Sequence, residues 1–194
     1  MKKIIRFIIG CLLVTYPFIV YFGLSLFTLR YVIIILGLIF VLRLFLVNWV
    51  REKTQARLSR FMIVIIAAIG LALCLFALIF NNQYWVQLYP FFINLLLFLV
   101  FLYSFLYPPT MIERFASISS KSEFPDEAIL YMRKVTLVWM VFFIINGLIA
   151  LLTALVTSIK VWALYNGFIA YVLIALIFVI EYGIRQRLKK KLDK

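Results

Sequence analysis

Polar side chains inside long apolar stretches are the residues of this sequence that could do chemistry. Asn94, Asn146 and Asn166 lie within such stretches, and so do Arg43 and Glu181. In hydrocarbon a polar group costs several kcal/mol unless it is paired or hydrated. These residues are therefore the first candidates for binding a substrate, a partner or another helix.

Arg43 and Glu181 could form an ion pair between two helices. Arg43 lies about seven residues, roughly 10 Å by helix rise, from the end of its stretch. Glu181 lies near the same side of the predicted membrane. Alternatively, Arg43 extends to the lipid headgroups and Glu181 pairs with Arg185 four residues later.

The three asparagines also have two interpretations. Asn-Gly-Leu-Ile-Ala at 146–150 returns as Asn-Gly-Phe-Ile-Ala at 166–170. Asn beside Gly allows two helices to approach closely and to hydrogen-bond, which would be a structural role. Alternatively, Asn146 and Asn94 line a polar cavity for a lipid headgroup or a substrate, and Asn166 is a further candidate of the same kind.

A charged segment between two apolar stretches, 108–134, supplies the remaining candidates. Thr110 and Glu113 have the spacing of a capping box, which predicts a short helix at the membrane interface. Glu113, Arg114 and Arg133 could contact an acyl substrate or a partner there. Simple solvation of these charges is the alternative.

Prolines set the limits of this segment. Pro108 and Pro109 end the preceding stretch, and Pro125 starts a helix that continues into the next stretch. Between the two predicted helices, 117–122 is expected to form a flexible polar link.

Several classes of enzyme are excluded by missing residues. The sequence contains no histidine, which removes His-dependent acyl transfer and His-activated serine chemistry. It also has no nucleotide-binding glycine motif and no carboxylate cluster. Cys11 and Cys74 both lie in apolar stretches, so neither a disulfide framework nor a metal site is indicated. We expect no catalytic residue, metal or cofactor, and this favours a non-enzymatic protein.

The composition predicts which secondary structure carries these candidate residues. Hydrophobic residues make up 67% and charged residues 14% of the chain, against about half and a quarter in soluble domains. Apolar stretches of about 20 residues, long enough to cross a bilayer, occur about six times. We therefore predict an all-α polytopic transmembrane bundle, a single membrane domain over 1–194, with spans at about 4–26, 30–50, 60–80, 86–107, 135–157 and 161–183. The first break, near 23–30, is predicted to be a helical hairpin.

The distribution of Lys and Arg predicts the orientation. Seventeen of the 20 lie before the first span, between the second and third, between the fourth and fifth, or in the basic tail at 184–194. Only Arg30 and Lys160 lie in the alternate loops. Cations concentrate on the cytoplasmic side of membrane proteins. Both termini are therefore expected in the cytoplasm, and the charge of +13 needs no nucleic acid partner.

The motif Pro-Pro-Thr-Met-Ile-Glu-Arg-Phe-Ala at 108–116, with Phe124-Pro125, Arg133, Trp139 and Asn146-Gly147 after it, resembles a family of small bacterial inner-membrane proteins. Members are typically encoded in aryl-polyene-type clusters beside ketosynthases and acyl carrier proteins. The resemblance implies synthesis or trafficking of a polyene or fatty-acyl lipid, and it brings no catalytic residues.

Two hypotheses about function follow. The first is a non-enzymatic component of the inner membrane whose basic cytoplasmic face docks acyl carrier protein or ketosynthase-type enzymes. The second is a small lipid or metabolite transporter that uses Asn94, Asn146 and Arg43 as a polar interior.

Overall fold

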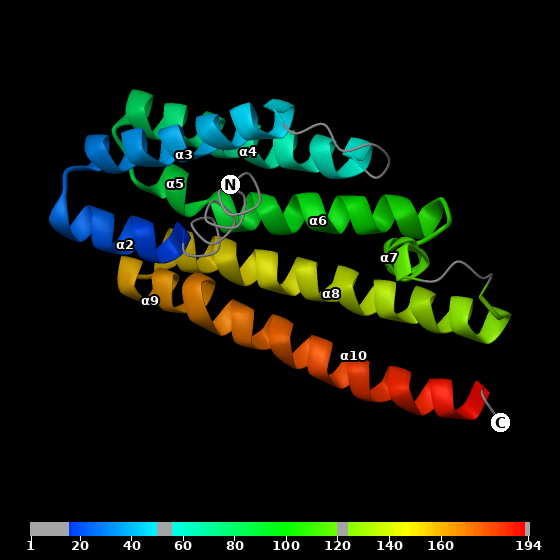
Figure 1. Cartoon of the computed structure of the whole chain (residues 1–194). Helices are drawn as coiled ribbons and strands as arrows, with labels where there is room; N and C mark the ends of the chain where they lie inside the picture. Colours follow the sequence, from blue (N-terminus) through cyan, green and yellow to red (C-terminus); the bar gives the residue numbers. More distant parts are fainter. Residues whose placement is uncertain (1–15, 50–55, 120–123, 193–194) are drawn as a thin grey trace. The chain divides into compact units, whose positions relative to one another are not determined.

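The structure is a computed structural model that describes residues 16–49, 56–119 and 124–192 (Figure 1). Within these ranges the chain consists of helices joined by short turns and contains no strand. In a hydrocarbon layer backbone polar groups must bond within their own segment, which a helix achieves and an open strand does not. The predicted all-α class is confirmed for the described residues.

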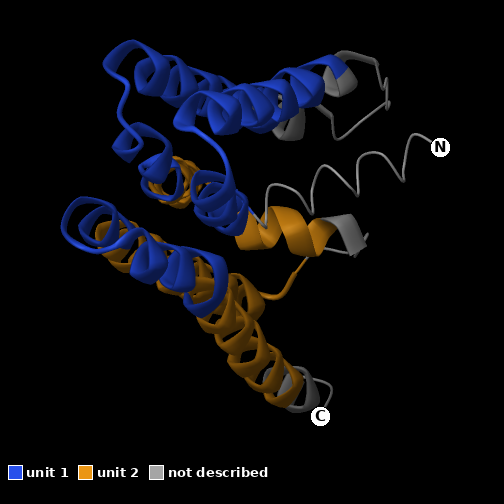
Figure 2. Cartoon of the chain, turned by 90° about the vertical axis from the view of Figure 1, so that its left-hand side faces the viewer, with its two compact units in different colours: residues 1–92, 150–169 blue, residues 93–149, 170–194 orange. Residues whose placement is uncertain are grey.

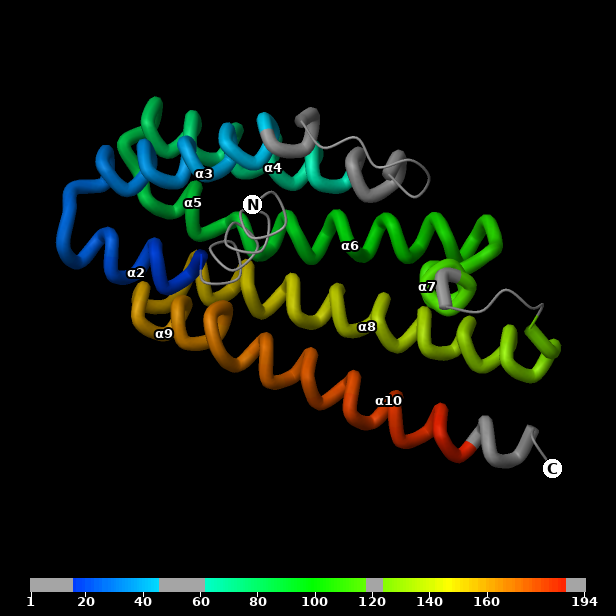
Figure 3. Tube along the Cα trace, viewed as in Figure 1, coloured from blue at the N-terminus to red at the C-terminus, as the bar shows by residue number. Residues whose placement is uncertain are grey.

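The helices follow the apolar stretches of the sequence. In chain order the elements are α2 (Tyr16–Leu26), α3 (Leu29–Trp49), α4 (Ala56–Phe80), α5 (Tyr84–Gln87), α6 (Tyr89–Leu106), α7 (Met111–Ser119), α8 (Asp126–Val156), α9 (Ile159–Leu164), the π-helical turn η1 (Tyr165–Ile169) and α10 (Ala170–Leu192). Figure 3 traces α8 as one uninterrupted helix of 31 residues. That length is about 46 Å by helix rise, more than the ~30 Å hydrocarbon layer.

Four helical segments of the described chain are long and apolar enough to cross a membrane: Met62–Phe80, Tyr84–Leu106, Asp126–Val156 and Ile159–Arg187. They coincide with four of the six predicted spans. Their outward surfaces are apolar as well, since Leu99 is 50% exposed and Val179 is 69% exposed. Such surfaces are compatible with lipid contact.

The first two predicted spans are described only in part. α2 ends at Leu26 and α3 begins at Leu29, so a break between two helices is present where it was predicted. Residues 4–15 of the first predicted span lie outside the described residues. The total of six spans stays a prediction.

Two helix boundaries bear on the predicted 108–134 segment. α8 begins at Asp126, directly after Pro125, as predicted. α7 continues to Ser119 and so takes up the start of the predicted link at 117–122. That part of the prediction was wrong. A further helical turn gives hydrogen-bond partners to backbone N–H and C=O groups that an irregular link would leave without them.

The chain forms two compact units (Figure 2). Unit 1 comprises Met1–Phe92 and Ala150–Ile169, and unit 2 comprises Ile93–Ile149 and Ala170–Lys194. Each unit has its own core.

In unit 1, rings pack against small residues. Gly70 of α4 faces Phe40 of α3 so closely that a side chain at Gly70 would collide with the ring. Phe40 also packs on Tyr89, with ring centroids 5.3 Å apart. Close approach at glycine is a common way for apolar helices to associate. α3 and α4 accordingly pack directly against each other.

Side-chain hydrogen bonds hold the single turn α5 in unit 1. The Tyr16 hydroxyl donates to the carbonyl oxygen of Val86 at 2.6 Å. Trp162 donates from Nε1 to the carbonyl oxygen of Gln87 at 3.0 Å. Both donors are buried, so α5 is fixed from α2 and α9.

Unit 2 has an aromatic core between α6, α7 and α8. Its buried members are Phe101, Met111, Val135, Trp139, Met140 and Phe143. Phe101 and Phe143 meet edge to face, with centroids 5.2 Å apart, and Trp139 lies 4.9 Å from Phe178 of α10. These contacts hold α6, α7 and α10 to α8.

Candidate functional site

The predicted cap of α7 by Thr110 is confirmed, and Glu113 bonds the hydroxyl of the same residue. The backbone N–H of Glu113 donates to Thr110 Oγ1 at 3.4 Å, and the Thr110 hydroxyl donates to Glu113 Oε1 at 2.7 Å. Next to it, the N–H of Met111 donates to Ser104 Oγ at 3.0 Å. The carboxylate of Glu113 is therefore used to fix the start of α7.

Arg114 and Arg133 both contact neighbours within unit 2. Arg114 donates from Nε to the carbonyl oxygen of Pro109 at 2.8 Å. The Arg133 guanidinium lies 4.5 Å from the ring centroid of Phe105, which is cation–π geometry. Arg133 is nevertheless exposed and keeps its charge at the surface. Of the two, it is the better placed for a partner.

Asn94 of α6 and Asn146 of α8 meet in the interior of unit 2. Asn146 donates from Nδ2 to Asn94 Oδ1 at 3.0 Å, and both side chains are buried. An amide pair of this kind joins two apolar helices, because each side chain gives the other a partner that lipid lacks.

Asn166 has a structural setting in unit 1. It lies in η1 and donates from Nδ2 to Thr153 Oγ1 at 3.2 Å and to the carbonyl oxygen of Trp162 at 2.9 Å. Its neighbour Gly167 faces Phe18, and a Cβ there would lie 2.7 Å from Cε2 of that ring. At this copy of the repeat, Asn166 forms hydrogen bonds within unit 1 and Gly167 allows the Phe18 ring to approach the backbone closely.

Glu181 and Arg43 belong to different units. Glu181 pairs with Arg185, with Oε1 and Nε 3.6 Å apart, which matches one of the two sequence interpretations. The Tyr131 hydroxyl lies within hydrogen-bond distance of the Glu181 carbonyl oxygen and Oε1, at 3.2 and 3.3 Å. Arg43 is half-buried on α3. Its pairing with Glu181 stays a prediction.

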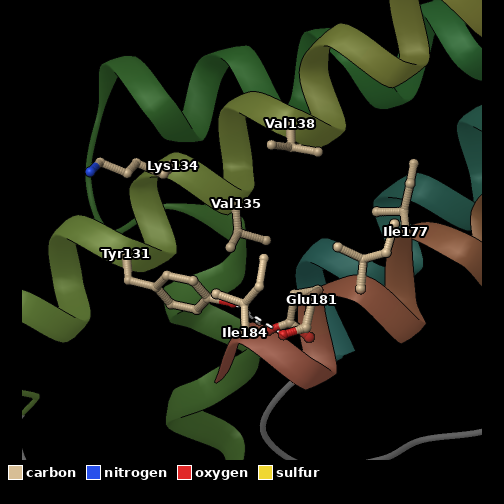
Figure 4. Close-up of a pocket in the computed structure, with 8 residues that line it drawn as sticks. Tyr131, Lys134, Val135, Val138, Ile177, Glu181 and Ile184 are labelled. Atoms are coloured by element: carbon tan, nitrogen blue, oxygen red, sulfur yellow. Dashed lines mark hydrogen bonds between the residues drawn. The ribbon is translucent and has the colours of Figure 1, made fainter. Parts of the chain in front are cut away.

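A cavity of about 380 Å³ lies between α8 and α10 within unit 2 (Figure 4). In Figure 4 the Tyr131 ring points across it towards Glu181. Its lining is apolar except at that end, and the residues are Tyr131, Lys134, Val135, Val138, Ile177, Ile180, Glu181 and Ile184. On each helix the lining residues follow the i, i+3, i+4, i+7 spacing of one helix face.

Sequence reasoning did not find this cavity. It treated Glu181 as an ion-pair residue and gave Tyr131 no part in binding. The signal that could have found it is the matched spacing of 131–138 and 177–184 in consecutive antiparallel spans. That signal shows one face of each helix, but not that the two faces meet.

The described residues contain no group of three or more His, Cys, Asp or Glu that could hold a metal ion. Their buried side-chain nitrogen and oxygen atoms all have hydrogen-bond partners. The geometry therefore offers an apolar recess with a polar end in unit 2, together with paired interior amides.

No protein-family model, curated protein or solved structure matches this chain. The resemblance carried by the 108–116 motif therefore stays a hypothesis.

Proposed function

We propose that the chain is a six-span protein of the bacterial inner membrane, with both termini in the cytoplasm, and that it is a non-enzymatic accessory component in the synthesis or trafficking of a polyene or fatty-acyl lipid. Its basic cytoplasmic face docks acidic acyl carrier protein or a ketosynthase-type enzyme. The four long apolar helices and the seventeen cations predicted on one side support this placement.

The observation that carries the proposal is the fixed position of α7. Its first turn is tied to α6 through Ser104, and Met111 is buried in the unit 2 core. The predicted cytoplasmic segment is thus an ordered element at 111–119, and the exposed cation Arg133 lies on the helix that follows. An ordered surface suits protein docking, since a partner does not have to order a loop, and the exposed Arg133 adds a cation that an acidic partner could contact.

The paired asparagines weaken the support for a transporter. A polar pathway needs side chains that face water or substrate, whereas Asn146 and Asn94 face each other. The transport hypothesis stays a prediction, and the observed contact favours a role in joining helices.

The proposal is tested by capture of acyl carrier protein on the full-length chain in native membranes. The docking variant is Arg133→Glu with Arg187→Glu, two exposed residues on the predicted cytoplasmic side. The matched control is Arg30→Glu with Lys160→Glu, two exposed residues predicted on the other side. We expect capture to fall about tenfold in the docking variant only, which corresponds to about 1.4 kcal/mol.

A deletion strain provides the second arm. We expect loss or mislocation of the polyene or acyl lipid when the gene is removed. Unchanged lipid, or equal capture by both double variants, would reject the proposed role.

A further inference from the structure

We propose that α7 lies along the surface of the membrane and that the ring of Phe115 inserts among the lipids of the predicted cytoplasmic leaflet. The partner of this side of α7 is the phospholipid bilayer. The sequence predicts a helix at the interface, and the contacts of α7 indicate which side of it meets lipid. This assignment rests on the proposed membrane placement and goes beyond the docking role, and it concerns unit 2 alone.

The direction of α7 differs from that of the long helices in unit 2. In Figure 1 it is seen along its axis, whereas α6, α8 and α10 extend lengthwise across the picture. A helix that runs across membrane-spanning helices lies along the plane of the membrane. Buried residues hold its first turn there, since the N–H of Met111 bonds Ser104 Oγ at 3.0 Å and Thr110 caps the helix.

The level of α7 coincides with the change from charged to apolar residues in α8. Lys134 is the last charged residue of α8, and 135–156 contains none. Met111 shares a buried core with Val135 and Trp139, which lie within the first two turns after that cation. The side of α7 that carries Met111 therefore faces the apolar part of α8, and α7 itself lies near the headgroup level.

Phe115 lies on the same side of α7 as Met111. The two residues are four positions apart, which places them on one face of an α-helix. Met111 is 6% exposed, whereas Phe115 is 53% exposed and does not belong to the buried core. The first turn of α7 thus lies over the core, and the ring in its second turn has an uncovered half on the side that faces the apolar layer.

Two exposed tyrosines on α6 lie at the same level. Tyr103 directly precedes Ser104, to which α7 is bonded, and Tyr107 follows one turn later. Their ring centroids are 5.0 Å apart, and both side chains are exposed. Tyrosine gathers where hydrocarbon meets headgroups, because its ring prefers apolar surroundings and its hydroxyl prefers water. This pair indicates independently that the start of α7 lies at that boundary.

The opposite side of α7 is polar. Ser117 is exposed and lies about 200° around the helix from Phe115, and Glu113 is bonded to Thr110. A helix with one apolar and one polar side lies parallel to a bilayer, with the apolar side about 5–10 Å into the headgroup boundary. The polar side of α7 and the exposed Arg133 then stay towards water, where a partner protein reaches them.

Nitroxide labels test this placement on the full-length chain in nanodiscs of phosphatidylcholine. Cys11 and Cys74 are replaced by alanine, and single cysteines are introduced by Phe115→Cys, Ser117→Cys and Leu99→Cys. Leu99 is 50% exposed within an apolar helical segment and reports whether the chain is in the membrane at all. Collisions with oxygen, which dissolves in lipid, and with a water-soluble nickel chelate give the depth of each label.

The two labels on α7 are expected to lie in different surroundings. The label at Phe115 should collide mainly with oxygen, and the label at Ser117 mainly with nickel. We expect a difference in depth of about 10 Å, the diameter of a helix with its side chains.

Two aspartate variants provide a matched pair without labels. Phe115→Asp places a carboxylate on the side assigned to lipid, and Ser117→Asp places the same group on the side assigned to water. Loss of the lipid contact of the ring should raise hydrogen exchange of α7 about fivefold or more in Phe115→Asp. In Ser117→Asp the exchange should stay within about twofold of the unchanged chain.

Three results would overturn the inference while leaving the membrane placement intact. The first is a label at Phe115 that collides with nickel while the label at Leu99 collides with oxygen, because α7 then faces the solution. The second is a label at Phe115 that neither reagent reaches, because protein, such as a second copy of the chain, then covers the ring. The third is equal hydrogen exchange in the two aspartate variants.

The proposed function fails in a different way. If the label at Leu99 also collides with nickel, the membrane placement is wrong and α7 cannot lie in a bilayer surface. Capture of acyl carrier protein is measured separately on variants of Arg133 and Arg187, which are unchanged here. Loss of the docking role therefore leaves the result for α7 intact, and the reverse also holds.

Discussion

Units 1 and 2 use their polar side chains to hold different kinds of backbone. In unit 1 the polar groups point inward and fix irregular backbone: Tyr16 and Trp162 bond the carbonyl oxygens of α5, and Asn166 bonds Thr153 beside the π-helical turn. In unit 2 the core is aromatic, the buried Asn146 and Asn94 join two regular helices, and Tyr131 and Glu181 meet at one end of an apolar recess.

This contrast follows from how regular the helices of each unit are. Short or irregular elements leave some backbone N–H and C=O groups without hydrogen-bond partners. Where water is absent, side chains must supply those partners. Long regular helices such as α8 and α10 satisfy their own backbone, so their side chains are free to form a recess. We therefore infer that the buried polar side chains of unit 1 stabilise irregular backbone, and four comparisons of stability test how the two units differ.

The largest effect is expected in unit 1 from Trp162→Ala. Trp162 is fully buried and donates a hydrogen bond to the carbonyl oxygen of Gln87 at the end of α5. Its replacement by alanine creates a cavity and leaves that oxygen without this donor. We expect the free energy of unfolding in detergent to fall by about 3 kcal/mol. Hydrogen exchange should rise in α5 and stay unchanged in residues 126–149 of α8, which belong to unit 2. The control Phe168→Ala removes a ring that is 58% exposed and should change stability by about 0.5 kcal/mol or less. Equal loss in both variants would contradict the structural role of Trp162.

A smaller effect in unit 1 is expected from Gly70→Ala. The new methyl group would collide with Phe40 and push α3 from α4, which should cost about 1–3 kcal/mol in thermal unfolding. Gly37 of α3 is the matched control, because a Cβ there meets nothing within 4 Å. Gly37→Ala should be neutral or slightly stabilising, since Ala is the better helix former. If Gly70→Ala behaves in the same way, the packing of α3 on α4 is wrong.

In unit 2, a double-mutant cycle on Asn94 and Asn146 measures the amide pair. We expect a coupling free energy of about 0.6–1 kcal/mol between Asn94→Leu and Asn146→Leu, the usual size of a hydrogen bond between membrane helices. Thermal unfolding of the four proteins gives this value. Additive effects, together with lost export of the lipid product, would instead favour the transport hypothesis.

The smallest stability effect is expected from Tyr131→Phe in unit 2. This change removes the hydroxyl that bonds Glu181 and keeps the ring, so we expect a loss of about 1 kcal/mol or less. Tyr182→Phe, on an exposed neighbour, is the control. A loss comparable to that of Trp162→Ala would remove the contrast between the two units.

The positions of the helices could be predicted because length and hydropathy determine them. The hairpin break before Leu29, the start of α8 at Asp126 and the capping of α7 by Thr110 all depend on local sequence. The break between α5 and α6 and the π-helical turn at Tyr165–Ile169 could not be predicted, since both rely on partners distant in the chain, such as Trp162 for α5.

The candidate site was less predictable than the helices. α8 and α10 are apolar around most of their circumference, so periodicity does not reveal which face meets a neighbour. Glu181 was recognised as a candidate from its type alone, but its contact with Tyr131 and the recess beside it depend on how two helices pack.

Reporter fusions along the full-length chain test the central claim, that the apolar helices cross the membrane with the basic segments in the cytoplasm. A reporter active only outside the cytoplasm is inserted at Asn82 or at Ser158, and a reporter active only inside is fused after Lys194. We expect all three fusions to be active. Activity of the outside reporter after Lys194, or its silence at both Asn82 and Ser158, would contradict it.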